Sequence, residues 1–251
     1  MDKVSIFGVN VLNISFKEAV ERIKELLKEE KFHYIVTPNT EIVMDAKNNP
    51  KMKEILNNAD MSVPDGIGLI YGSKIRNKPL KERVTGYDLS LEMLNICEKE
   101  GYSLYLLGTK PETVKKAYTS LKEQRPKLNL IGYNHGFFKG AHTNQAGHEE
   151  EIKVIEEINR LKPDIIFLGL GYPKQEIWID TNKDKLNTRL IIGNGGVIDI
   201  LSGDAKRAPD IFIKLNLEWF YRLITNPSRI KRQMAIPKFL AAVIFNKDSV
   251  K

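Results

Sequence analysis

Short apolar runs alternate with charged, amphipathic stretches along most of the chain. This alternation is typical of an α/β fold, in which buried strands are layered with helices. Seven runs rich in β-branched, aromatic and leucine side chains are predicted strands: residues 4–7, 33–36, 60–63, 103–107, 128–133, 164–168 and 189–192. Because several of these runs are apolar throughout, we expect a Rossmann-like parallel sheet that is covered on both faces.

The amphipathic segments between these runs are predicted helices: residues 15–30, 40–47, 89–99, 111–124, 149–161 and 174–185. Ser15 is expected to cap the first helix, because its side-chain oxygen can accept a hydrogen bond from a backbone N–H group of the first turn. The alternation of strand and helix is most regular between residues 102 and 192. This half of the chain carries the strongest prediction of a parallel sheet.

Residues 141–148 interrupt that order, since they contain no Lys, Arg, Asp or Glu. The composition predicts a polar loop. His142 and His148 lie six residues apart within it. We favour a mobile loop over a metal site for this pair.

The chain also changes character after Gly203. Pro209 is expected to open a helix that continues to about Ile224, and a further helical stretch is predicted over residues 237–245. We therefore divide the chain into an α/β domain of residues 1–204 and a basic, amphipathic helical appendage of residues 205–251.

The charge of the chain is concentrated in that appendage. The chain has 251 residues, 42% of them hydrophobic and 28% charged, which excludes a disordered chain, a collagen-like repeat and a disulfide scaffold. Ten of the 39 basic and three of the 32 acidic residues follow position 204, which leaves 29 of each at positions 1–204. The whole net charge of +7 therefore belongs to the last 47 residues. We expect an anionic partner there: phosphates, nucleic acid or an anionic membrane surface.

Several classes of site are excluded by what the sequence lacks. Cys97 is the single cysteine, so an intrachain disulfide and a Cys₂His₂ zinc site are impossible, and the four histidines do not have HExxH spacing. The N-terminal residues do not have the pattern of a signal peptide, and the apolar run at 239–245 is too short to span a bilayer. We expect a cytoplasmic protein that can touch a membrane without crossing it.

Polar and glycine-rich clusters follow five of the predicted strands, where ligands bind in parallel α/β sheets. They are Thr37-Pro38-Asn39, Pro64-Asp65-Gly66, Gly108-Thr109-Lys110, Gly169-Leu170-Gly171 continuing to Lys174-Gln175-Glu176, and Gly193-Asn194-Gly195-Gly196. A carboxylate held between proline and glycine suits a general base, and it equally suits an Asp that fixes its own turn. Asn39 is equally well explained as a helix cap.

Neither of the last two clusters has the GxGxxG or Walker pattern, so a dinucleotide dehydrogenase and a P-loop NTPase are disfavoured. The sequence also has no Asp-x-Asp pair of the kind that holds a divalent metal against a diphosphate. We therefore expect no metal and no cofactor, and we expect cations and backbone N–H groups to neutralise phosphate charge.

Arg222, Arg229 and Arg232 are spaced to share one face if the helix resumes past Pro227. Arginine suits bidentate phosphate contacts. The apolar stripe around these arginines is explained equally well by packing on the body and by contact with anionic lipid. Arg83 is a further candidate cation, with a solvated Glu–Arg pair as the alternative.

Taken together, these clusters resemble the WecG/TagA/CpsF glycosyltransferase family, glycosyltransferase family 26, over nearly the whole chain, and its TagA branch most closely. The motifs that carry the resemblance are Thr37-Pro38-Asn39, Pro64-Asp65-Gly66-x-Gly68, Glu82-Arg83-x-x-Gly86-x-Asp88, Leu107-Gly108, Gly169-x-Gly171-x-Pro173-Lys174-Gln175-Glu176, Gly195-Gly196-x-x-Asp199-x-x-x-Gly203, Arg207-Ala208-Pro209 and Leu217-Glu218-Trp219-x-x-Arg222-Leu223. Asn216 and Asn226 depart from the residues that the family often has, and residues 141–148 look like an insertion.

The resemblance implies an inverting transferase that moves N-acetylmannosamine from a UDP-sugar donor to N-acetylglucosamine linked to undecaprenyl diphosphate, forming a β-1,4 linkage in wall teichoic acid synthesis. Residues 1–204 would then be the catalytic domain, and residues 205–251 would face the membrane and the diphosphate.

Inversion in one displacement needs a base on the acceptor hydroxyl, and the hypothesis assigns that role to Asp65. Thr37 and Gln175 would position substrate hydroxyls. The remaining substrate-binding candidates are Asn39, Arg83, Gly169, Gly171, Lys174, Gly195, Gly196, Arg222, Arg229 and Arg232.

Three alternatives remain at this stage. A related transferase would use the uronic acid of the same sugar or another sugar of cell-surface polysaccharides. A nucleic-acid-binding protein would use the basic tail, but it leaves the polar strand ends unexplained, so we expect no nucleic acid partner. An epimerase or dehydrogenase of sugar nucleotides would need the missing GxGxxG pattern. The sequence leaves the oligomeric state open, a homo-oligomer included.

Overall fold

The computed structural model describes residues 1–225, 230 and 234–251, apart from the side chain of Arg222. At its centre six strands form one sheet in the order β4-β3-β8-β7-β5-β6, and every pair of neighbours is parallel. The strands are β3 (His33–Val36), β4 (Met61–Ser62), β5 (Leu104–Gly108), β6 (Leu130–Asn134), β7 (Ile165–Gly169) and β8 (Leu190–Gly193). The predicted parallel α/β fold is confirmed.

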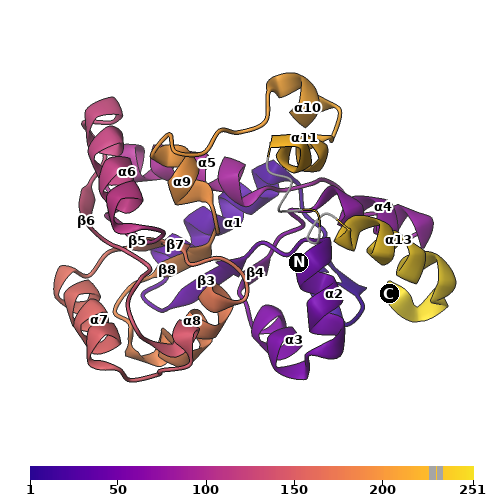
Figure 1. The fold of residues 1–251 in the computed structure, drawn as a ribbon, viewed down its shortest axis with the longest axis horizontal. Helices are drawn as coiled ribbons and strands as arrows, with labels where there is room; N and C mark the ends of the chain where they lie inside the picture. The colour runs from indigo at the N-terminus through magenta and orange to yellow at the C-terminus, as the bar shows by residue number, and fades with distance from the viewer. Residues whose placement is uncertain (226–229, 231–233) are drawn as a thin grey trace.

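Helices cover both faces of this sheet (Figure 1). In β7, Ile166 and Leu168 pack into one apolar cluster, whereas Ile165 and Phe167 pack into another, because successive strand residues point to opposite faces. The first cluster joins α2 (Thr40–Asn48), α3 (Pro50–Asn57), α4 (Ile67–Ile75), α7 (Glu149–Leu161), α8 (Lys174–Asn182) and α13 (Ala235–Phe245). The second joins α1 (Phe16–Lys28), α5 (Gly86–Glu100), α6 (Pro111–Gln124) and α9 (Val197–Leu201).

The first predicted strand forms, but it does not join the parallel sheet. β1 (Lys3–Ile6) pairs with β2 (Val9–Leu12), which the hydrophobic pattern did not reveal, in a separate antiparallel hairpin. Phe7 and Gly8 both have positive φ, which reverses the chain within two residues. The C-terminal end of the chain adds to this hairpin, because Ser5 and Lys251 exchange backbone hydrogen bonds of 2.8 and 2.9 Å.

Helix α1 begins as its sequence predicts, with a capping box in which the Ser15 hydroxyl accepts a hydrogen bond from the Glu18 backbone N–H. Helix α4 was not predicted, because its two glycines lower helix propensity by about 1 kcal/mol each. A Cβ atom on Gly68 would lie 2.4 Å from Thr40, and one on Gly72 would lie 2.6 Å from the Phe239 ring. The glycines therefore allow α4 to pack closely against α2 and α13.

The appendage begins with two short helices. The prediction of a single helix from Pro209 to Ile224 is wrong, since α10 (Asp210–Lys214) and α11 (Glu218–Thr225) are separated at Asn216. Asn216 has a φ of 59°, a left-handed conformation that asparagine tolerates better than most residues.

The segment 141–148 is a loop with one short 3₁₀ turn. The buried Glu151 accepts hydrogen bonds from its Ala141 and Gly147 N–H groups.

Helix α13 belongs to the core of the body. Phe239 and Val243 of α13 are completely buried, in the same apolar cluster as α2 and α4. Arg76 at the end of α4 donates hydrogen bonds to the Val243 and Ile244 carbonyls near the end of α13. The division of the chain at residue 204 stays a prediction. Among the described helices, none combines the length and apolar character that crossing a bilayer requires.

Candidate active site

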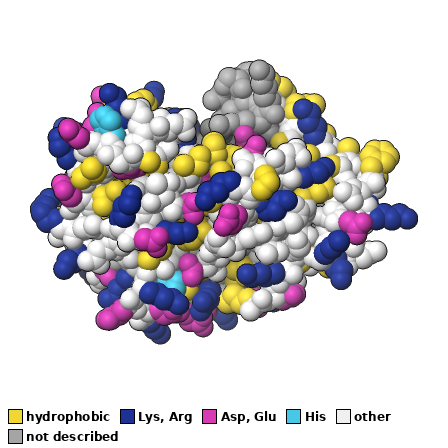
Figure 2. Space-filling view, turned by 90° about the horizontal axis from the view of Figure 1, so that it is seen from below, with side chains coloured by type: hydrophobic (Ala, Val, Ile, Leu, Met, Phe, Trp, Pro, Cys, Tyr) yellow, Lys and Arg dark blue, Asp and Glu magenta, His cyan; other side chains and the backbone are white. Residues whose placement is uncertain are grey.

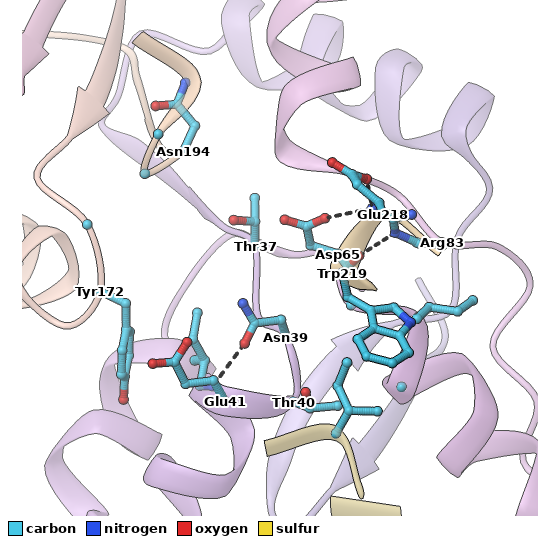
Figure 3. Close-up of a pocket in the computed structure, with 18 of the residues that line it drawn as sticks. Thr37, Asn39, Thr40, Glu41, Asp65, Arg83, Tyr172, Asn194, Glu218 and Trp219 are labelled. Carbon is cyan, nitrogen blue, oxygen red and sulfur yellow. Dashed lines mark hydrogen bonds and ion pairs between the residues drawn. The ribbon is translucent and has the colours of Figure 1, made fainter. Parts of the chain in front are cut away.

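A cleft opens at the carboxyl ends of β3 and β8. These neighbouring strands are followed by α2 and α9, which lie on opposite faces of the sheet, so the connecting loops diverge. Such a divergence is where open α/β sheets bind ligands. The Thr37 hydroxyl donates a hydrogen bond of 3.2 Å to the Gly193 carbonyl and holds the two strand ends together. Thr37 lies between the two sides of the cleft in Figure 3.

Asp65 lies beside Arg83 on one side of this cleft (Figure 3). Its backbone N–H donates to the Pro38 carbonyl at 3.1 Å, and its carbonyl accepts from Arg83 Nε at 2.7 Å. The Asp65 side chain is 32% exposed, and its Oδ1 lies 3.9 Å from Arg83 Nη2. A carboxylate is thus held on a fixed backbone at the cleft with a guanidinium beside it.

Arg83 is not part of a solvated Glu–Arg pair with its neighbour. Glu82 instead accepts a hydrogen bond from the backbone N–H of Phe16. Arg83 Nη2 donates at 2.6 Å to Glu218, the first residue of α11, and the Arg83 and Glu218 side chains are 17% and 7% exposed. Glu218 was not predicted as a site residue, although it belongs to the Leu217-Glu218-Trp219 motif.

Gln175 joins the loops that follow β7 and β8. Its Oε1 accepts hydrogen bonds from the N–H groups of Gly171 and Gly195 at 3.2 and 3.1 Å. Its Nε2 donates to Glu176 at 2.9 Å. Gln175 lines the cleft and is 3% exposed, so most of its carboxamide is engaged within the protein. Its predicted contact with substrate hydroxyls stays a prediction.

Glu176 lies in the first turn of α8 and is 1% exposed. Its Oε2 has no hydrogen-bond partner among the described residues. Burial raises the pKa of this carboxyl to about 7, because the charged form loses its hydration. Glu176 therefore holds a proton to far higher pH than an ordinary glutamic acid.

Backbone groups border the open part of the cleft at Gly171 and Gly195. Both have positive φ, 75° and 52°, and a Cβ atom on either would meet no atom within 4 Å. A ligand can therefore approach the backbone closely at these positions. Gly196 also lines the cleft.

Two other predicted residues lie apart from the cleft lining. Gly169 ends β7, and its carbonyl accepts a hydrogen bond from the Thr109 N–H at 3.0 Å. Lys174 is exposed at the start of α8.

Asn39 lines the cleft, and its Oδ1 accepts from the Ile42 N–H at 3.1 Å, as the capping alternative requires. The predicted trio of tail arginines cannot be placed: Arg229 and Arg232 lie outside the described residues, as does the side chain of Arg222.

The C-terminal segment supplies part of the cleft wall that sequence reasoning did not assign. Asn216, Glu218, Trp219 and Ile236 all line the cleft. Residues from the body that were also missed are Glu41, Tyr172 and Asn194. For the four residues of the C-terminal segment, the only local signal was the Glu218-Trp219 motif. The residues that they meet at the cleft are distant from them in sequence.

A second hollow adjoins the first. The two share Asp65, Arg83, Asn194, Gly196 and Glu218. The second continues between the start of α5 and the loop after α9, where its lining includes Thr85, Gly86, Tyr87, Val197, Asp199, Ile200, Asp204, Ala205 and Lys206. The Asp65–Arg83 pair therefore lies where two hollows meet.

Two contacts of Arg207 stabilise the border of the second hollow. Arg207 stacks over the Tyr87 ring at 4.5 Å and pairs with Asp88 at 2.7 Å.

The described residues contain no group of three or more His, Cys, Asp or Glu side chains arranged to hold a metal ion.

The sequence of this chain matches a family of known proteins. A sequence model of the glycosyl transferase WecG/TagA/CpsF family matches residues 4–250. A protein of Bacillus spizizenii is 35% identical over 87% of this chain and 81% of its own length, and one of Bacillus subtilis is 31% identical over 100% and 94%. A protein of Staphylococcus aureus is 34% identical over 99% of this chain and 95% of its own length.

All three relatives are named N-acetylglucosaminyldiphosphoundecaprenol N-acetyl-beta-D-mannosaminyltransferase. The match covers both the strand-end loops and the C-terminal segment that together form the cleft. This chain is a glycosyltransferase and belongs to the WecG/TagA/CpsF family.

Proposed function

We propose that this enzyme transfers N-acetylmannosamine from UDP-N-acetylmannosamine to N-acetylglucosamine linked to undecaprenyl diphosphate, in the linkage unit of wall teichoic acid. The observation that carries the proposal is the junction of two hollows at Asp65 and Arg83. A transferase must bring two substrates to one reacting centre, and two hollows that meet at one pair of charged side chains suit that requirement. The names of the relatives support the sugar and the lipid acceptor.

In the proposed reaction, Asp65 takes the proton from the 4-hydroxyl of the acceptor sugar. The acceptor oxygen attacks the anomeric carbon of the donor, the bond from that carbon to the UDP oxygen breaks, and UDP leaves with the bonding electrons. Attack opposite the leaving group inverts the anomeric centre and gives a β-1,4 linkage. General-base help of this kind contributes about 10²–10⁴-fold to the rate.

The charge that develops on the leaving diphosphate needs neutralisation. Arg83 lies at the junction of the hollows. Its guanidinium is a strong partner for phosphate oxygens, and Gly171 and Gly195 leave room for a phosphate to approach, while their own N–H groups donate to Gln175. We assign the donor diphosphate to this part of the cleft and propose that Thr37, Asn39 and Gln175 orient the sugars.

The acceptor's lipid would remain in the bilayer, and the C-terminal segment has a surface suited to contact it. Ile211, Leu215 and Ile224 are 63%, 60% and 59% exposed, and Lys206 and Lys214 of the same segment are exposed. Apolar side chains beside lysines favour an anionic membrane surface. The face in Figure 2, by contrast, mixes basic with acidic side chains. We propose peripheral contact with the inner face of the membrane through residues 205–225.

The test is a transfer assay with the full chain, UDP-N-acetylmannosamine and a short-chain lipid-diphosphate acceptor, in which UDP release and product mass are followed. We expect UDP release that depends on the acceptor and persists in EDTA. UDP release without acceptor, or product made equally well from the uronic acid donor, would contradict the proposed substrates. Asp65→Asn is the matched control for background hydrolysis.

A further inference from the structure

Arg83 connects two parts of the chain that are far apart in sequence. Its Nε donates to the carbonyl of Asp65 at 2.7 Å, and its Nη2 donates to Glu218 Oε2 at 2.6 Å. Glu218 opens α11 in the C-terminal segment, whereas Asp65 follows β4 in the body. The three side chains lie together on one side of the cleft in Figure 3.

This contact is removed from water to a degree that makes it energetically important. The Arg83 and Glu218 side chains are 17% and 7% exposed. Exposed ion pairs contribute little, but removing one partner of a buried pair leaves the other charge without compensation. The Arg83 guanidinium is therefore held from two sides, by Glu218 of α11 and by the Asp65 carbonyl.

The position of Arg83 in turn affects Asp65. Arg83 bonds to the backbone of Asp65 and lies 3.9 Å from its Oδ1, so a displaced guanidinium changes both the support and the electrostatic surroundings of that carboxylate. The Glu218 side chain also lines both hollows, which places it beside the substrates' meeting point.

We propose that Glu218 is a positioning residue of this active site. Its carboxylate holds the Arg83 guanidinium against the Asp65 loop, where the two hollows meet. The inference rests on the proposed function and extends it: the C-terminal segment acts on the chemical step through the Glu218–Arg83 ion pair, separately from any contact with lipid.

The experiment measures kcat and the donor KM of the full chain in the transfer assay for Glu218→Ala, Glu218→Gln and the control Asp184→Asn. Asp184 is an exposed carboxylate in the 3₁₀ turn at Lys183–Lys185, away from both hollows. We expect Glu218→Ala to lower kcat roughly 10- to 100-fold, the size of a charge-assisted hydrogen bond, with donor KM changed less than about threefold. Glu218→Gln keeps an acceptor oxygen and should retain part of the rate, and Asp184→Asn should equal the wild type.

A double-mutant cycle separates positioning from a general loss of structure. If Glu218 acts through Arg83, adding Glu218→Ala to Arg83→Ala should change kcat by less than about twofold. A second loss as large as the first would overturn the inference, as would a fully active Glu218→Ala.

Thermal unfolding of each variant identifies any that does not fold. If Glu218→Ala does not fold, the same double-mutant cycle is measured with Glu218→Gln and Arg83→Ala, and the same outcomes support or overturn the inference. A wild-type chain without transfer would overturn both this inference and the proposed function, whereas an active wild type with a neutral Glu218→Ala overturns the inference alone.

Discussion

In β5 and β7 every residue is buried, whereas the segment 210–225 leaves Ile211, Leu215, Phe220 and Ile224 at least 40% exposed. Both regions are rich in apolar side chains. The strands are covered by helices on two faces, whereas α11 contributes Glu218 and Trp219 to the cleft lining and leaves Phe220 and Ile224 exposed. Similar hydrophobic content therefore serves folding in the body and supplies an exposed surface in residues 205–225.

The end of the C-terminal segment is as deeply buried as the core of the body. Phe239 of α13 is completely buried against the glycine face of α4, although it lies far beyond Gly203. The contrast in the molecule is therefore between the core, which includes α13, and the short helices α10 and α11. Four variants test the cleft, the core and the exposed segment in turn.

Asp65→Asn should have the largest effect on catalysis. It removes the proposed base while keeping the size of the side chain, so kcat should fall by about 10²–10⁴-fold with donor binding retained. The rate is measured in the transfer assay, and donor affinity by calorimetry. Turnover near that of the wild type would remove Asp65 from this role.

Phe239→Ala should have the largest effect on stability. Removing a buried phenylalanine deletes apolar contacts and leaves a cavity, at a cost of about 3–5 kcal/mol in the free energy of unfolding. Urea unfolding measures the change, with Phe245→Ala as the control because that side chain is 88% exposed. Equal effects of the two substitutions would contradict the assignment of α13 to the core.

Glu176→Gln should change how stability depends on pH. The pKa of Glu176 is raised to about 7 from 4.5, so between these values the folded state holds a proton that the unfolded state has lost. Wild-type stability should therefore fall as pH rises through this window, by at most about 3 kcal/mol, and the variant should lack this contribution. Urea unfolding at pH 5 and pH 8 tests it. A stability difference that is the same at both pH values would show that Glu176 is not protonated by burial.

Replacing Ile211, Leu215 and Ile224 together by serine should have the smallest effect on the fold. Because these side chains are exposed, the free energy of unfolding should change by less than about 1 kcal/mol. Binding to anionic liposomes should fall at least about tenfold, since apolar area and charge both contribute to such binding. Sedimentation with vesicles measures it. Unchanged binding would contradict membrane contact through these side chains. A large loss of stability would show that they contribute to the core.

Much of the fold could be predicted from the sequence because its signals are local. Helices α6 and α7 have the bounds that periodicity and flanking residues predict. The strands from β3 to β8 lie within one or two residues of the predicted runs. Helix α4 escaped prediction because glycine has low intrinsic propensity, and the close packing that compensates for it involves Phe239, more than 160 positions away.

The same division applies to the candidate site. Strand-end positions alone predicted that Thr37, Asp65, Gln175 and the glycine pair at 195–196 would lie at one edge of a sheet, because parallel strands end at the same edge. No local pattern could reveal that Gln175 bonds to two loops, or that Arg83 pairs with a residue 135 positions away. Only the tertiary structure decided which side chains contact one another there, because those contacts depend on how the α/β core and residues 205–225 pack together.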